Sequence, residues 1–124
     1  MPVQPSDLVA TLLARHGAAR VRQLERAERL RRAARRTGGG LRAEGAIDGA
    51  WLVGSLAWGG FGAHSDVDVV VRGSDPRAVG ALWVRFLEEL GPDAEGRVDL
   101  LRLEDLPRSF RDRVLAEGWR LDEP

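Results

Sequence analysis

The apolar residues in the first third of the chain recur at helical spacing. A first short helix is predicted to begin at Ser6 or Asp7, either of which can cap it, and to end at Gly17. A second helix is predicted over residues 19–36, where one apolar stripe recurs every three residues: Val21, Leu24, Ala27 and Leu30. The glycine run at residues 38–40 is predicted to end this helix and to form a flexible joint.

Beyond residue 45 the pattern changes to three short runs that are typical of strands. These runs cover residues 47–53, 66–72 and 98–103. Helical segments separate them, and the long one between the second and third runs can serve as a crossover. The sequence therefore predicts an α/β (α+β) fold with a small mixed β-sheet flanked by helices.

Two helices in this part of the chain have recognisable ends. The crossover helix is predicted to start with Asp75 as N-cap and Pro76 at its first position, and to end at Gly91. The last helix is predicted to open at Pro107 and to stop at Gly118, leaving a short tail.

The charge is divided unevenly, although the formal net charge is zero. Residues 1–42 contain ten Arg and three acidic residues, and residues 43–124 contain nine Arg and sixteen acidic residues. We therefore expect an N-terminal, Arg-rich helical segment over 1–42 and a core over 43–124, within one compact domain overall. Nucleic-acid binding by the Arg-rich segment is possible but not favoured, because no aromatic residues interleave its arginines. A solvated face, or one that docks on an acidic partner, is the better interpretation.

Composition excludes some chemistry. There is no cysteine, so disulfides and thiolate catalysis are excluded, and all nineteen basic residues are Arg, so no catalytic lysine exists. No run of 18 or more apolar residues and no signal-peptide pattern is present, which leads us to expect a cytoplasmic protein without a membrane span.

Three acidic residues interrupt the strand-like runs. Side chains alternate across a strand, so Asp66 and Asp68 point to one face, roughly 6.6 Å apart along the backbone. Two carboxylates this close repel one another, and a divalent cation relieves that repulsion. Hard oxygen ligands favour Mg²⁺. Asp99 in the third run can complete a triad if its strand lies beside the second, as a two-metal site for in-line displacement requires.

A small-residue turn precedes the acidic pair. Gly54 lets the backbone approach a phosphate closely, and Ser55 adds a hydroxyl donor. Ser65 can either orient Asp66 or cap a turn. In the alternative interpretation, the acids lie on an exposed edge strand and the glycine-rich segment is a plain hairpin loop.

Together these residues resemble the signature of the minimal nucleotidyltransferases of the DNA polymerase beta superfamily. That signature is Gly-Ser, nine intervening residues, Ser-Asp-x-Asp, and a later strand with the third acid. Its positions here are Gly54, Ser55, Ser65, Asp66, Asp68 and Asp99. The resemblance covers about residues 45–121.

The resemblance implies a palm-like sheet, with ATP and Mg²⁺ as cofactors and transfer of AMP with release of pyrophosphate. It implies that Asp66 and Asp68 bind metal, and that Asp99 binds metal and assists deprotonation. It also implies that Gly54 and Ser55, with Ser65 beside them, bind the nucleotide. Many members have Arg at the position of Trp58, which leaves the nucleotide preference open here.

The resemblance also implies a partner. Small stand-alone members act as antitoxins by adenylylating a tyrosine of a HEPN-type ribonuclease toxin, so a homo- or hetero-oligomer is expected. Two alternatives stay open. One is a weakly catalytic or non-catalytic antitoxin that binds its partner by occlusion. The other is a nucleotidyltransferase that acts on a small hydroxylated molecule.

Overall fold

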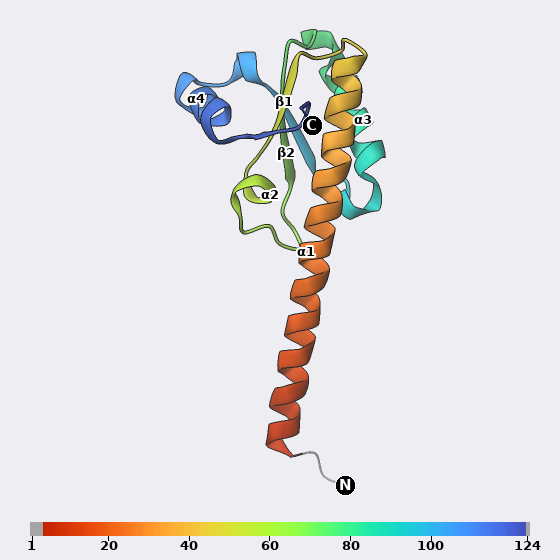
Figure 1. The fold of residues 1–124 in the computed structure, drawn as a ribbon, viewed down its shortest axis with the longest axis vertical. Coiled ribbons are helices and arrows are strands. Elements are labelled where there is room, and N and C mark those ends of the chain that lie inside the picture. The colour runs from red at the N-terminus through yellow and green to blue at the C-terminus, as the bar shows by residue number, and fades with distance from the viewer. Residues whose placement is uncertain (1–3, 124) are drawn as a thin grey trace.

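The computed structural model describes residues 4–123 and contains one four-stranded mixed sheet with the strand order β3-β2-β1-β4. The helices and strands, in chain order, are α1 (Pro5–Ala43), β1 (Gly49–Val53), α2 (Ser55–Trp58), β2 (Val67–Arg72), α3 (Val79–Leu90), β3 (Val98–Arg102), α4 (Arg108–Glu117) and β4 (Trp119–Arg120). Helices flank the sheet (Figure 1). The predicted α/β class with a small mixed sheet is confirmed.

The sheet is built around β1 and β2. These two strands are antiparallel, β4 pairs with β1 in the antiparallel sense, and β2 pairs with β3 in the parallel sense. α3 forms the crossover between β2 and β3, as the sequence predicts. β4 was not predicted as a strand; its two residues pair with Trp51 and Leu52 and give the sheet its fourth strand.

Alternation along β2 produces two apolar layers. Val67, Val69 and Val71 are buried in the larger core beneath α1 and α3. Val70 points to the opposite face and packs with Val114 of α4 in a smaller core. Figure 1 shows α1 and α3 on one side of the sheet and α4 on the other. β2 is therefore covered on both faces.

The N-terminal third differs from the prediction. α1 is one continuous helix of 39 residues, so Gly17 does not end a helix and residues 38–40 do not form a joint. A glycine inside a helix costs only about 1 kcal/mol relative to alanine, and at residues 38–40 docking of the helix on the sheet outweighs that cost. At Gly38 the missing side chain is required, because a Cβ atom there would lie 2.9 Å from the Cβ of Leu121. The glycine run lets α1 lie close to the chain's C-terminal tail.

Only the second half of α1 is covered by the sheet. Leu30 and Ala34 are fully buried, whereas Leu12 and Leu13 are 61% and 67% exposed. With 3.6 residues per turn, Leu12 falls on the same face as Leu30 and Ala34. The apolar face of α1 thus continues beyond the sheet along a free stretch, residues 5–22, which projects from the domain in Figure 1. Within residues 4–123, no helix is long and apolar enough to cross a membrane.

The glycine run supplies a matched pair of substitutions. Gly39→Ala should raise the free energy of unfolding by about 0.5–1 kcal/mol, because nothing lies within 4 Å of its Cβ position and alanine favours helix. Gly38→Ala should lower it by about 1 kcal/mol, because overpacking against Leu121 exceeds the helix gain. Urea unfolding followed by circular dichroism measures both. Equal effects at the two positions would contradict the docked geometry.

Candidate functional site

Strand register brings the predicted acidic residues together at one end of the sheet. In the parallel pair, Asp68 of β2 lies opposite Asp99 of β3. Asp68 alternates to the same face as Val70, which is the face that α4 partly covers. Asp66 precedes β2 by one residue and is exposed, as is Asp99, whereas Asp68 is half-buried. The condition set for Asp99, that its strand lie beside that of Asp68, is met.

Gly54 follows β1 and touches this acidic group. Val53 is the register partner of Asp68, so the next residue reaches the Asp68 side chain. Gly54 has a φ angle of 70°, and a Cβ atom there would collide with the Asp68 carboxylate. Both the backbone angle and the close approach therefore demand glycine. Ser55 comes next and begins α2, so the segment expected as a plain turn contains a four-residue helix.

The electrostatics of the three acids show that they interact. Burial, the negative charges of Asp99 and Asp66, and a hydrogen bond that protonated Asp68 donates to Asp99 together raise the pKa of Asp68 to about 6. Ionising Asp68 thus costs more free energy in the folded protein than in the unfolded chain, and a bound positive charge would offset that cost.

The donor set fits a hard cation. Carboxylate oxygens are the ligands that Mg²⁺ prefers, and Mg²⁺ in nucleotide sites is held by one or two carboxylates together with phosphate oxygens. Across residues 4–123, no group of three or more His, Cys, Asp or Glu side chains is arranged to hold a metal ion without help. Asp68 and Asp99 would therefore act as a ligand pair, with Asp66 at its edge and phosphate oxygens completing the shell.

Two further residues of the motif have defined contacts. The Ser65 hydroxyl accepts a hydrogen bond from the Gly62 amide at 3.0 Å, so it caps a turn, which was one of its two predicted roles. The indole of Trp58 donates to the Glu117 carbonyl at 2.9 Å, and the Arg113 guanidinium lies 4.0 Å from its ring centroid. Trp58 thus fastens α2 to α4 and lies against the smaller core.

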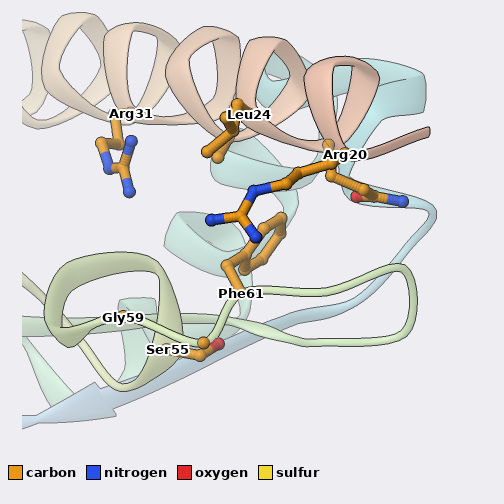
Figure 2. A pocket seen from close by; sticks show the side chains of 9 residues that line it. Arg20, Leu24, Arg31, Ser55, Gly59 and Phe61 are labelled. Carbon is orange, nitrogen blue, oxygen red and sulfur yellow. The ribbon is translucent and has the colours of Figure 1, made fainter. Parts of the chain in front are cut away.

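A cleft opens on the other side of Ser55, between α1 and the segment 55–61. Its volume is about 460 Å³. It is lined by Arg20, Gln23, Leu24, Ala27, Arg31, Ser55, Gly59, Gly60 and Phe61. In Figure 2, side chains of α1 point across the cleft toward the segment that carries Ser55 and Phe61.

The sequence analysis did not associate Arg20 and Arg31 with the motif. The two residues are eleven positions apart, close to three full helical turns, so they share a face only if the helix is continuous. This eleven-residue spacing could have indicated that Arg20 and Arg31 share a face. It could not show that the face lies beside Ser55, because that depends on how α1 packs relative to α2.

Comparison with known proteins gives no match: no family model, no curated protein and no solved structure matches this chain. Its function is therefore inferred from the site itself.

Asp68 gives the site a pH signature in stability. The folded-state pKa of about 6 lies above the ordinary value of 3.8 for an aspartate, so the folded protein binds the Asp68 proton more tightly than the unfolded chain does. Stability should therefore fall as pH rises from about 4 to about 6. Asp68→Asn should remove this loss and raise the free energy of unfolding at pH 8 by about 1–2 kcal/mol, a value reduced for solvent screening.

Urea unfolding in chelated buffer, repeated at several pH values, measures this difference. Asp112→Asn, at an exposed acid of α4, is the control and should leave the pH profile unchanged. Added Mg²⁺ should stabilise the native protein more than Asp68→Asn. If Asp68→Asn is no more stable than the native protein at pH 8, repulsion among the three acids does not destabilise the fold.

Proposed function

We propose that this protein is a Mg²⁺-dependent nucleotidyltransferase that transfers AMP from ATP to a hydroxyl group. The observation that carries the proposal is the pairing of Asp68 with Asp99 on adjacent parallel strands, with the Gly54–Ser55 turn against them. The pairing of Asp68 with Asp99 would by itself also be compatible with an exposed sheet edge that has no binding function. The raised pKa of Asp68 and its contact with Gly54 favour a site instead.

The proposed roles follow from position. Asp68 and Asp99 would hold Mg²⁺ as a pair, with Asp66 as a third ligand at their edge, and the ion would offset charge on the phosphates. Gly54 and Ser55 hold the triphosphate chain. The acceptor oxygen bonds to the α-phosphorus while the bond from that phosphorus to the bridging oxygen of the β-phosphate breaks. Pyrophosphate leaves, and the exposed Asp99 carboxylate accepts the acceptor's proton.

The proposed acceptor is a tyrosine of a HEPN-type ribonuclease, which makes this protein an antitoxin acting in the cytoplasm. The free stretch of α1 supports a protein partner, because large apolar side chains line it without cover. They are Leu8, Val9, Leu12 and Leu13, each more than half exposed. An uncovered apolar face of this extent is typical of a surface that binds another protein.

Neutralisation by occlusion is a second candidate function, favoured by the same face of α1. Binding through that face needs none of the three carboxylates. The two candidates therefore differ in what the acidic residues contribute, and substitution at these residues separates them.

Incubation of the protein with ATP, Mg²⁺ and the partner should attach AMP to the partner, detected by intact mass. Asp66→Ala and Asp68→Ala should each reduce the rate at least about 100-fold, because the metal ligands stabilise the transition state by several kcal/mol. Asp112→Ala on α4 is the matched control and should retain the native rate. If the native protein binds ATP and Mg²⁺ but yields no adduct, the transferase proposal fails. If Asp68→Ala still neutralises the partner, occlusion is favoured.

The free stretch of α1 gives a separate test of partner binding. Leu12→Glu combined with Leu13→Glu should weaken partner binding at least about 100-fold, because two large apolar side chains lose their burial. Thr11→Glu combined with Ala14→Glu adds the same charge on the opposite face and should bind normally. Calorimetry measures both, and binding of ATP should be unchanged. Normal partner binding by the leucine variant would place the interface elsewhere.

A further inference from the structure

The cleft between α1 and residues 55–61 has the chemistry of an anion site. Two guanidinium groups line it, those of Arg20 and Arg31, and none of its lining residues is acidic. Gln23 and Ser55 add neutral polar groups. Leu24, Ala27 and Phe61 form an apolar wall that lowers the local dielectric, which strengthens attraction between the guanidinium groups and a bound anion.

Arg31 is held in place through its Nε, and its terminal nitrogens make only one long ion-pair contact. Its Nε donates to the Leu56 carbonyl at 3.0 Å, which ties it to α2. The guanidinium also lies 5.7 Å from the centroid of the Trp119 ring. Its nearest acid, Glu28, is 3.8 Å from Nη1 and pairs more closely with Arg32, at 3.2 Å. A guanidinium fixed through Nε can present its two terminal N–H groups as a fork.

Arg20 faces the same cleft from three turns earlier on α1. It is exposed, and no ion pair or hydrogen bond joins its side chain to another group among residues 4–123. In Figure 2 its side chain reaches along the helix toward Phe61, while Arg31 points down toward Gly59 and Ser55. The two cations thus approach the cleft from both ends.

On the opposite wall, Gly59 and Gly60 present backbone without side chains. Gly59 and Gly60 have φ angles of 107° and 85°, in the region that disfavours other residues, and nothing lies within 4 Å of their Cβ positions. A phosphate group can therefore approach the backbone here.

Two consecutive residues connect this cleft to the acidic group. Gly54 lies against the Asp68 carboxylate, and Ser55 lines the cleft. Their Cα atoms are about 3.8 Å apart. A carboxylate cluster that needs a cation and a basic cleft thus lie on either side of one short turn. A triphosphate bound on this turn would have one electrostatically favourable orientation, with its terminal phosphates in the basic cleft.

We propose that Arg20 and Arg31 bind the β- and γ-phosphates of the nucleotide, and then the pyrophosphate formed from them. The identity of the nucleotide rests on the proposed function, but the anion site does not. The α-phosphate lies toward Asp68 and Asp99, and the terminal phosphates lie in the cleft. Because the guanidinium groups bind phosphate directly, pyrophosphate binds even without a divalent cation.

Calorimetric titration of the full chain with inorganic pyrophosphate, in chelated buffer, tests this site. Arg20→Gln and Arg31→Gln should each weaken binding about 10-fold, and the double variant more strongly, because each removes a charge-assisted hydrogen-bond pair. Arg22→Gln is the matched control: it removes the same charge from the same exposed stretch but lies on the opposite face of α1, and should change affinity less than about twofold. Helical circular dichroism and thermal unfolding verify that each variant is folded.

Three results would overturn the inference. They are the absence of pyrophosphate binding at millimolar concentration, native affinity in the folded double variant, and equal weakening by Arg22→Gln, which would indicate diffuse charge attraction. Arg31→Lys separates charge from geometry: it should bind more weakly than the native protein because a lysine lacks the fork.

The same measurements distinguish this inference from the proposed function. Asp68→Asn should retain or improve pyrophosphate binding, since it removes a negative charge near the turn. If pyrophosphate binds through the two arginines while the native protein forms no AMP adduct, the anion site stands and the transferase proposal falls. If AMP transfer occurs while the double variant binds pyrophosphate normally, the transferase stands and this inference falls.

Discussion

Burial of β2 on both faces is the constraint on which the rest of the structure depends. Its valines alternate into two cores, one beneath α1 and α3 and one beneath α4. A slip of one residue in its pairing would exchange these layers and bury a charge, so the register is strongly specified. The same register places Asp68 opposite Asp99 and beside Gly54. The packing that stabilises the sheet therefore also brings the acidic residues together. The raised pKa of Asp68 reflects the unfavourable free energy of holding these carboxylates so close.

α1 has three roles because it is one helix. Its second half covers the sheet, its middle forms one wall of the cleft beside Ser55, and its first half continues into solvent with an apolar face. A break at Gly17 or at residues 38–40 would uncouple these parts. Since the helix is continuous, the position of Arg20 relative to Ser55 is determined by how Leu30 and Ala34 pack on the sheet.

The sequence predicted the parts of the fold that depend on local patterning. The period-two runs gave the three main strands to within two residues, and the Asp75 side chain accepts from the Arg77 amide at 2.9 Å, as an N-cap should. The acidic residues were recognised as a candidate site because side chains alternate regularly along a strand and a helical crossover joins parallel strands. Helix continuity at Gly38 was missed, because its cause is close contact with Leu121, far away in the sequence. The role of Trp58 could not be predicted for the same reason, because its partners, Arg113 and Glu117, belong to α4.

Contacts within the molecule compensate part of the uneven division of charge along the chain. Arg29 pairs with Asp93 at 2.8 Å, Arg26 donates to the Asp93 carbonyl, and Arg42 pairs with the buried Asp122 at 2.8 Å. For Arg29 and Arg42 the acidic partner is the chain's own core. Exposed pairs of this kind contribute little stability, but several along one helix select its rotation and register on the sheet. Arg20 is outside this set. Arg31 has only a long contact with an acid that already serves Arg32. Among the arginines of α1 that make no close ion pair, Arg20 and Arg31 are the two that line the cleft beside Ser55.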